Sequence, residues 1–543
     1  MKAAELFVRA LENEGVDTVF GIPGEENIDV MDVLLESEIK FITTRHEQGA
    51  AFMADVYGRL TGKAGVCFST LGPGATNLVT GVADANMDRA PVVAVAGQAG
   101  TDRMHKESHQ HLDLVNLFRP ITKYSSQIRV PEIVPEIVRK AFKQAEAEKP
   151  GASFIDFPEN IARAEVDGKA PLKVQSPMPP VPPSEKIKQA AAIISAAQSP
   201  LIMAGNGVIR AGAADELSVF AQKLNIPVAT TFMAKGAIPF SSPLCLGAVG
   251  LQAHDYVACG FDRADVIICV GYDMVEYHPY LWHEGDRKIV HVDSTPAEVD
   301  EHYIVAAGVI GNICDGLRGI AAEARPKQKS YAASLRQLIV DELSEHSDND
   351  AFPVKPQKII QDLRRVLGDE DIVVSDVGAH KLWVARMYQA ESPNTCIISN
   401  GFASMGIGVP GALAAKLAFP DRTVVTVTGD AGFLMNSQEI ETALRIGTPF
   451  VILIWNDGEY GLINWHQQRR FGRPSYVDFT NPDFVQYAES FGAKGYRVKS
   501  AGELVPILRQ AVADRTVAVI DCPVDYSENI KLTDKLGKLV CPI

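Results

Sequence analysis

The sequence lacks any excess of positive charge. Of its 543 residues, 52 are Lys or Arg and 67 are Asp or Glu, which leaves a net charge of −15 at pH 7. Nucleic acids and anionic membranes are bound largely through basic side chains. The chain contains no basic run and no basic patch interleaved with aromatic residues, so neither partner is expected.

Cysteine is scarce and is not arranged in close pairs. The eight cysteines are scattered, and none of them forms a CxxC motif. Because zinc sites and disulfide scaffolds usually show closely spaced cysteines, this pattern argues against both. We therefore expect reduced thiols, as in a cytosolic enzyme.

Long apolar runs are also missing. No run approaches the length of about 20 residues that a membrane-spanning helix needs. Acidic residues interrupt the amphipathic segment 1–15, which is therefore expected to be a helix rather than a signal peptide. The sequence contains no short-period repeat and no low-complexity tail. The expected location is the cytoplasm.

Short apolar runs that alternate with amphipathic helices make up most of the chain. Its length predicts about two to four domains. Five prolines between positions 177 and 183 mark a semi-rigid linker within 166–186, and 325–357 forms a second crossing between domains. The alternation predicts an α/β fold with three doubly wound, parallel-sheet domains, which cover residues 1–165, 187–324 and 356–530.

The segment 429–461 is the most informative about function. A strand at 424–427 leads into Gly-Asp-Ala-Gly, and a second apolar run at 450–455 leads into Asn-Asp. Because the carboxyl ends of parallel strands meet at one edge of a sheet, Asp430 and Asp457 are expected side by side. Such oxygen ligands suit Mg²⁺ holding a diphosphate. The alternative is an ordinary turn of a doubly wound sheet with acidic caps.

A third carboxylate, Glu47, is a candidate of another kind. It lies between the apolar pair 41–42 and the helical segment 50–60. A carboxyl group in a largely apolar pocket retains its proton more readily and can bond a ring nitrogen. The alternative is a helix cap at the surface. The glycine-rich stretches 21–25 and 71–77 favour the buried site.

Seven motifs in order give the chain a family resemblance. They are GIPGE (21–25), RHEQGAAFMADVYGRLTGKAGVC (45–67), LGPGATNL (71–78), SHQHLD (108–113) with LFRPITKYS (117–125), ISNGFASMGIGVPGA (398–412), GDAG to WND (429–457) and CPVDYSEN (522–529). On these motifs the chain resembles, over nearly its full length, the acetolactate synthase branch of the thiamine-diphosphate enzymes. That resemblance implies a pyrimidine-binding first domain, a central domain and a diphosphate-binding third domain.

The resemblance also implies two cofactors, thiamine diphosphate and Mg²⁺. Glu47 would bond the aminopyrimidine ring, and the carbonyl of Ala403 would accept a hydrogen bond from its amino group. Met405 would wedge the two rings of the cofactor into a V, although a methionine here could equally fill the core.

The diphosphate and its metal would be held by the third domain. Asp430 and Asp457 would bind Mg²⁺ through their side chains, and Glu459 through its backbone carbonyl. His380 is either a phosphate contact or a helix cap. Other residues expected near the cofactor are Gly74, Gly378, Gly429, Ala431, Gly432 and Tyr460.

The substrate residues implied by the resemblance are Gln110, Met435, Leu462 and His466. Related pyruvate decarboxylases carry two adjacent histidines where this chain has His109-Gln110. Loss of that proton relay favours carboligation over release of an aldehyde. Catabolic acetolactate synthases differ at the last three positions, which leaves the acceptor open. Tyr526 is expected to contribute to a lid.

The predicted activity is that of an acetolactate synthase, a transferase that decarboxylates pyruvate and joins the two-carbon unit to a second pyruvate. A 2-oxoacid decarboxylase, or a carboligase with another acceptor, is the alternative. FAD is not expected, because Tyr272–Tyr277 follow the strand at 266–271 as in flavin-free relatives. Since the family builds its site between two subunits, a homodimer is required and a homotetramer is expected. A dehydrogenase is disfavoured, because no GxGxxG with a following acidic residue is found.

Overall fold

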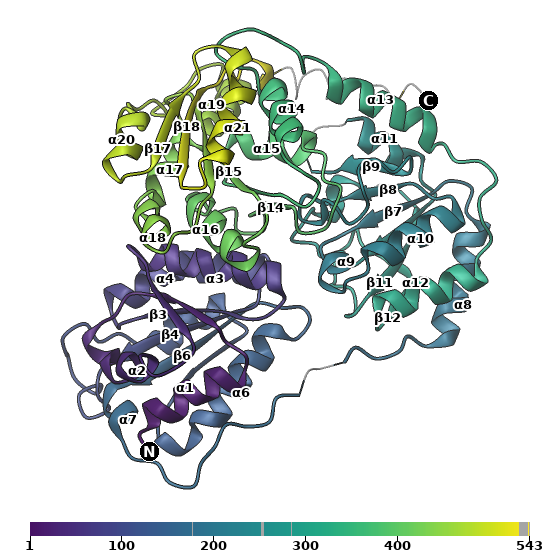
Figure 1. Cartoon of the computed structure of the whole chain (residues 1–543). Coiled ribbons are helices and arrows are strands. Elements are labelled where there is room, and N and C mark those ends of the chain that lie inside the picture. Colours follow the sequence, from purple (N-terminus) through teal and green to yellow (C-terminus); the bar gives the residue numbers. More distant parts are fainter. Residues whose placement is uncertain (176–177, 251–254, 284, 531–540, 542–543) are drawn as a thin grey trace.

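The structure is a computed structural model that describes residues 1–543 except 176–177, 251–254, 284, 531–540 and 542–543. Three six-stranded sheets follow one another along the chain, and the strand pairs in all three are parallel. The prediction of three doubly wound parallel sheets is confirmed. In Figure 1 the third sheet lies above the first, and the second sheet lies to the right of both.

The first sheet has the order β2-β1-β3-β4-β6-β5. Its strands are β1 (Thr18–Gly21), β2 (Lys40–Thr43), β3 (Gly65–Ser69), β4 (Val92–Gln98), β5 (Tyr124–Gln127) and β6 (Ala152–Pro158). Its helices are α1 (Ala3–Asn13), α2 (Ile28–Leu34), α3 (Glu47–Thr61), α4 (Pro73–Met87), α5 (Leu114–Phe118), α6 (Val134–Glu146) and α7 (Glu159–Arg163).

The second sheet has a different order, β12-β11-β10-β7-β8-β9, which is that of dinucleotide-binding domains. Its strands are β7 (Pro200–Ala204), β8 (Val228–Thr230), β9 (Cys245–Ala248), β10 (Val266–Val270), β11 (Lys288–Asp293) and β12 (Val305–Ile310). The helices of this part are α8 (Ser184–Ala196), α9 (Gly207–Arg210), α10 (Ala214–Leu224), α11 (Tyr256–Arg263), α12 (Ile313–Glu323) and α13 (Ala332–Ser344).

The third sheet repeats the order of the first, as β14-β13-β15-β16-β18-β17. Its strands are β13 (Ile372–Ser375), β14 (Cys396–Ile398), β15 (Val424–Gly429), β16 (Val451–Asn456), β17 (Lys494–Arg497) and β18 (Ala518–Pro523). Its helices are α14 (Pro356–Val366), α15 (Ala379–Met387), α16 (Gly408–Ala418), α17 (Asp430–Asn436), α18 (Glu439–Arg445), α19 (Gly461–Phe471), α20 (Phe484–Ser490) and α21 (Leu504–Ala513).

Burial explains why the central strands read as unbroken apolar runs. Every residue of β4 and β10 is buried, and so are the first five residues of β16. Helices cover both faces of each sheet, so that side chains pointing either way leave water. In sheets covered in this way, ligands usually bind at the carboxyl ends of the strands.

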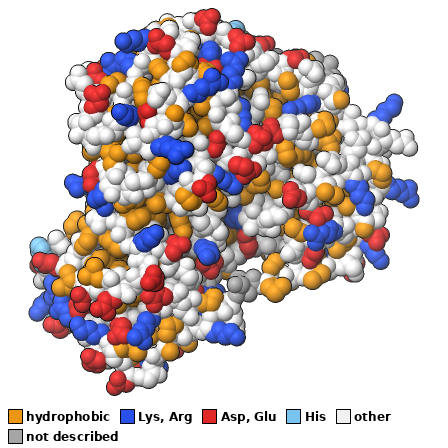
Figure 2. Space-filling model, viewed as in Figure 1, with side chains coloured by type: hydrophobic (Ala, Val, Ile, Leu, Met, Phe, Trp, Pro, Cys, Tyr) orange, Lys and Arg blue, Asp and Glu red, His pale blue; other side chains and the backbone are white. Residues whose placement is uncertain are grey.

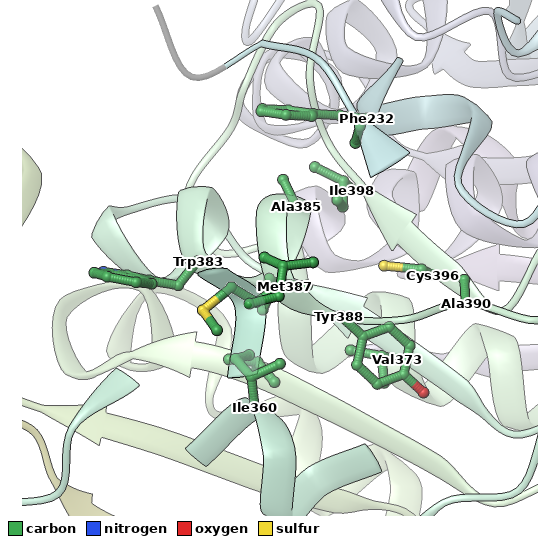
Figure 3. Close-up of a cluster of buried hydrophobic side chains, with 14 of the residues drawn as sticks. Phe232, Ile360, Val373, Trp383, Ala385, Met387, Tyr388, Ala390, Cys396 and Ile398 are labelled. Atoms are coloured by element: carbon green, nitrogen blue, oxygen red, sulfur yellow. The ribbon is translucent and has the colours of Figure 1, made fainter. Parts of the chain in front are cut away.

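The third domain packs against both of the others. Helices α3 and α4 of the first domain lie under α16 and α18 of the third, as Figure 1 shows. Toward the second domain, Phe232 lies beside Ile398 and Ala385 in one continuous apolar core (Figure 3). The active-site elements of the third domain are therefore anchored on two sides.

The distribution of charged side chains on the surface agrees with the net negative charge of the sequence. On the face seen in Figure 2, basic and acidic side chains are interspersed, and no single basic field dominates. Among the described helices, none is both long and apolar enough to cross a membrane.

One expectation from the sequence is wrong. Cys259 of α11 and Cys541 form a disulfide, so two of the eight cysteines are not reduced thiols. The bonded residues are 282 positions apart, and only the fold brings them together. Asp262 lies close enough to this pair for the three to resemble a metal cluster, but the two sulfurs are bonded to each other. The other six cysteines are free.

Candidate active site

The first and third sheets carry the predicted motifs at equivalent places. In each, the strand order reverses between the first and third strands, at β1/β3 and at β13/β15. Ligands of doubly wound sheets bind at the carboxyl ends of the strands at such a point. GIPGE follows β1, LGPG follows β3, and GDAG includes the end of β15.

Glu47 is buried at the start of α3. Glu47 is only 8% exposed, so the alternative of a helix cap at the surface is wrong. The amide of Asn77, on α4, donates to its Oε2 at 2.9 Å. Gly74 lies so close that an added Cβ would come within 3.3 Å of its Oε1. The first turn of α4 therefore forms one wall of the Glu47 site.

A second buried glutamate, Glu439, holds the turn that precedes Glu47. Its Oε1 accepts hydrogen bonds from the backbone N–H groups of Arg45 and His46, at 3.1 Å each. Thr442 donates a third bond to its Oε2 at 2.6 Å. Burial raises the pKa of Glu439, and these bonds oppose that shift. Because Glu439 belongs to α18, the third domain fixes the entry into α3.

Gln110 reaches the same place from another loop. Its backbone has a left-handed φ of +57°, and its side chain is exposed. An added Cβ on Gly72 would lie 2.8 Å from the carbonyl oxygen of Gln110, so this residue lies against the turn before α4. Gln98 holds the loop through the carbonyl of Leu112 at 3.1 Å. The structure thus brings Gln110, Gly74 and Glu47 together.

Asp430 and Asp457 follow two strands that are paired directly. Gly429, the last residue of β15, pairs with Trp455 of β16. The N–H of Gly458 donates to Oδ2 of Asp430 at 2.7 Å, which ties the two strand ends together. Glu459 follows at once, and its backbone carbonyl accepts one bond, from the N–H of Gly461.

The electrostatics of this pair suit a divalent cation. Burial, then the charges of Asp430 and Glu459, raise the pKa of Asp457 to about 8. Burial also raises the pKa of Asp430. Oδ2 of Asp457 is buried without a hydrogen-bond partner. Two crowded carboxylates with a free buried oxygen fit a Mg²⁺ ion, which binds oxygen ligands and neutralises their repulsion.

The glycines of the third domain lie around one buried histidine. An added Cβ on Gly378 would meet the His380 ring at 2.8 Å, and one on Gly429 would meet it at 3.3 Å. Burial lowers the pKa of His380 to about 3, so that the ring is neutral, and its Nε2 lacks a partner. Gly432 lies against Asp376 in the same way. A bare backbone beside an unpaired imidazole nitrogen fits a diphosphate group.

Two further residues predicted to contact the cofactor, Ala431 and Tyr460, lie beside these glycines. The N–H of Ala431 donates to Oδ1 of Asp430 at 2.9 Å, so that this amide is already engaged. Tyr460 is 41% exposed, and its ring packs against Phe479 with centroids 5.1 Å apart.

Ala403 and Met405 lie on the loop between β14 and α16. Ala403 adopts a left-handed φ of +57°, which costs an L-residue about 1–2 kcal/mol. Asp376 accepts hydrogen bonds from the N–H groups of Gly406 and Gly408 at 2.9–3.1 Å. Met405 is only partly buried, in contrast to the methionines of the core. The partial exposure of Met405 on a restrained loop suits the predicted wedge between the cofactor rings better than a position in the core.

The predicted acceptor residues lie on two helices. Met435, on α17, is 42% exposed and lies against Gly406, next to Met405. Leu462 and His466 lie one turn apart on α19, and His466 is exposed. Tyr526 packs on Trp455 with ring centroids 6.0 Å apart, and it lines a cavity of about 540 Å³ with Asp457 and Glu459.

The two halves of the site are not joined directly within one chain. Among the described residues, no hydrogen bond or ion pair connects Glu47 to Asp430, Asp457 or Glu459. The third domain instead bonds the two neighbours of Glu47: Glu439 accepts from the N–H of His46, and Asn436 donates to the side chain of Gln48, at 3.1 Å each.

Four supporting residues were missed in the sequence: Asn77, Asp84, Glu439 and Asn481. The amide of Asn481 donates to Oδ2 of Asp430 at 2.7 Å and to Asn456 at 3.1 Å. Each of these residues acts across 30 or more positions of sequence. Asn77, Asp84 and Glu439 lie on helices among apolar positions, which is a weak local signal, and Asn481 lies on a loop.

Comparison with known proteins agrees with these observations. Three thiamine pyrophosphate enzyme models match the chain: the N-terminal TPP binding domain at 1–117, the central domain at 187–320 and the C-terminal TPP binding domain at 376–522. An acetolactate synthase of Bacillus subtilis is 38% identical, over 99% of this chain and 96% of its own length. A catabolic acetolactate synthase of Raoultella terrigena is 36% identical, over 98% and 97%. A probable acetolactate synthase large subunit of Methanocaldococcus jannaschii is 37% identical, over 99% and 94%. The chain therefore belongs to the acetolactate synthase family of thiamine pyrophosphate enzymes.

Proposed function

We propose that this protein is an acetolactate synthase, which decarboxylates pyruvate and joins the two-carbon unit to a second pyruvate to give 2-acetolactate. The observation that carries the proposal is the buried carboxyl group of Glu47, in a chain that also presents the Asp430–Asp457 pair. The names of its relatives point to the same reaction.

Thiamine diphosphate supplies a carbon nucleophile that adds to a 2-oxoacid and stabilises the charge left after loss of CO₂. Glu47 would bond the aminopyrimidine ring, and the Ala403 carbonyl would accept its amino hydrogen. Asp430, Asp457 and the Glu459 carbonyl would hold Mg²⁺. The residues that would face the diphosphate are Gly378, Gly429, Gly432 and His380. The N–H of Ala431 already donates to Asp430.

Whether the enzyme ligates or only decarboxylates depends on whether a nearby group protonates the carbanion that is left after loss of CO₂. Gln110 carries no titratable group, and it lies beside the Gly72–Gly74 turn near Glu47. A neutral amide there can orient a carboxylate or carbonyl without protonating a carbanion. Met435, Leu462 and His466 would line the acceptor side, with Tyr526 and Tyr460 restricting access of water. A decarboxylase remains the second candidate, to be separated by its product.

Exposed apolar side chains around the third-domain half-site support a dimer. The exposed ones are Phe402, Leu434, Met435, Tyr460, Ile463, Phe471 and Tyr476. A second copy of the chain would cover them and bring its own Glu47 to the Asp430–Asp457 pair. We extend the proposal to a homotetramer in the cytoplasm, with domain boundaries at 1–165, 187–324 and 356–530.

The second domain supports a flavin-free enzyme. The backbone N–H of Asn206, after β7, donates to both oxygens of Glu276, at 3.1 and 2.9 Å. Thr231 donates to the same carboxylate at 2.5 Å. These donors lie where a sheet of this order receives the phosphates of a dinucleotide. Glu276 thus places a carboxyl group of the chain itself at the anion position, which disfavours FAD.

The test uses purified protein with thiamine diphosphate and Mg²⁺, without FAD, and with pyruvate as the sole substrate. Products are identified by NMR. Acetolactate is the expected product, and Glu47→Gln should lower its rate by about 10²–10⁴ while the protein still folds. Acetaldehyde as the main product would assign the enzyme to the decarboxylases. Sedimentation of the same sample gives the oligomeric state.

A further inference from the structure

The loop that carries Ala403 and Met405 is held by two buried aspartates at the end of α4. Oδ1 of Asp84 accepts hydrogen bonds from the hydroxyl of Ser399 at 2.8 Å and from the N–H of Ser404 at 3.2 Å. Asp88 accepts from the N–H groups of Asn400 and Gly401, at 2.9 and 2.5 Å. Both carboxylates are 0–1% exposed. They are one helical turn apart, so they face the loop together.

The bond from Ser404 to Asp84 has a consequence for Ala403. The N–H of Ser404 and the C=O of Ala403 belong to the same planar peptide unit, and in a trans peptide they point in opposite directions. A side chain that fixes the direction of this N–H therefore also fixes the direction of the Ala403 carbonyl. Because the φ of Ala403 is +57°, the peptide needs such a restraint to stay in place.

Arg59, Lys381 and a third buried acid, Asp55, lie near these two aspartates; burial and the charges of Asp84 and Asp88 raise the pKa of Asp55 well above its ordinary value. Arg59, on α3, lies 3.6 Å from Asp88 and donates to the carbonyl of Ile398 at 2.8 Å. Burial lowers the pKa of Lys381 to about 8, whereas the charges of Asp88 and Asp84 oppose that shift. The aspartates are thus accompanied by cations on the two neighbouring helices α3 and α15.

We propose that Asp84 is a positioning residue of the active site: it holds the N–H of Ser404 and thereby aims the carbonyl of Ala403 at the amino group of the cofactor. This inference rests on the role given to Ala403 under the proposed function. Asp88 anchors the preceding turn of the same loop. In the dimer proposed above, helix α4 would then support two sites, because Asn77 at its other end bonds Glu47, which belongs to the site completed by the partner.

A matched pair of variants separates the hydrogen bond from the charge. Asp84→Leu has similar size but no acceptor, whereas Asp84→Asn keeps one acceptor oxygen for the Ser404 N–H, loses the charge and replaces the second oxygen by an NH₂ donor. Three properties are compared with the wild type: hydrogen–deuterium exchange at C2 of the bound cofactor without substrate, kcat and KM for pyruvate, and amide exchange of residues 399–406 in the cofactor-free protein. Thermal unfolding checks that each variant is folded.

We expect Asp84→Leu to slow C2 exchange and kcat by about tenfold or more, the cost of one lost buried hydrogen bond. KM for pyruvate should stay within about twofold, since the substrate is not touched. Amide exchange of the loop should become faster, and Asp84→Asn should restore most of each property. A folded, cofactor-loaded Asp84→Leu that exchanges C2 at the wild-type rate overturns the proposal. So does an Asp84→Asn that loses as much as Asp84→Leu.

Should Asp84→Leu fail to fold, Ser399→Ala tests the same peptide. The hydroxyl of Ser399 is the other acceptor for the N–H of Ser404, at 3.2 Å. Its removal should slow C2 exchange by about threefold, and an unchanged rate contradicts the inference. C2 exchange needs no substrate, so a wild type that makes another product from pyruvate refutes the proposed function and leaves this test intact.

Discussion

Binding of Mg²⁺ to the metal-free protein is expected to release a proton from Asp457. The carboxyl group of Asp457 has its pKa raised to about 8 by burial and by Asp430 and Glu459, and Tyr526 packs over the same side. At neutral pH most of the metal-free protein therefore carries a proton on Asp457. A cation that binds this carboxylate must displace it.

The size of the effect follows from the position of that pKa. Between pH 6 and pH 7 the deprotonated fraction rises about tenfold, so the affinity for Mg²⁺ should also rise about tenfold, or 1.4 kcal/mol. The sign for stability is the opposite. A raised carboxyl pKa means that the metal-free protein loses folding free energy as pH rises from the ordinary value of 3.8 toward about 8. Mg²⁺ restores it.

Calorimetric titration of the metal-free protein in two buffers of different ionisation enthalpy counts the released protons. We expect close to one proton per ion at pH 6.5. Asp457→Asn is the matched control, because the amide keeps an oxygen ligand but cannot titrate. It should bind Mg²⁺ with little pH dependence from pH 6 to pH 8. A wild type whose affinity is equally flat would show that Asp457 is ionised before the metal arrives.

Three further outcomes are expected. Asn481→Ala removes a donor to Asp430 and should weaken Mg²⁺ binding by about tenfold in the same titration; unchanged affinity would mean that Gly458 orients Asp430 alone. Phe232→Ala opens the core between the second and third domains and should lower the free energy of unfolding in guanidinium by about 3–5 kcal/mol, whereas a loss below 1 kcal/mol would imply that the two domains do not share this core. Titration of thiols in the denatured protein should find six without reductant and eight with it; eight without reductant would rule out the disulfide.

The sequence predicted those features that depend on local pattern. Apolar runs between helices predicted three parallel sheets, and turns at strand ends predicted where Glu47 and Asp430 would lie. The supports of these residues could not be predicted, because each comes from a distant segment. Glu439 acts on Arg45 across 394 positions, and Asp84 acts on Ser404 across 320.

The disulfide is another example of a long-range contact. Spacing along the chain indicates disulfides when cysteines cluster, and here the bonded pair is 282 residues apart. The same limit applies to Glu276, whose contact with the backbone N–H of Asn206 spans 70 positions of sequence.

The shared strand order of the first and third sheets bears on the origin of the active site. Two sheets with the same order in one chain are consistent with duplication of a single domain, whereas the second sheet has a different order. After such a duplication both copies offer the same crevice, and each is free to keep a different half of the chemistry. One copy retained a buried acid, and the other retained the carboxylate pair. The two copies still depend on each other, because Glu439 of the third domain holds the turn before Glu47 and Asp84 of the first domain holds the loop that carries Ala403.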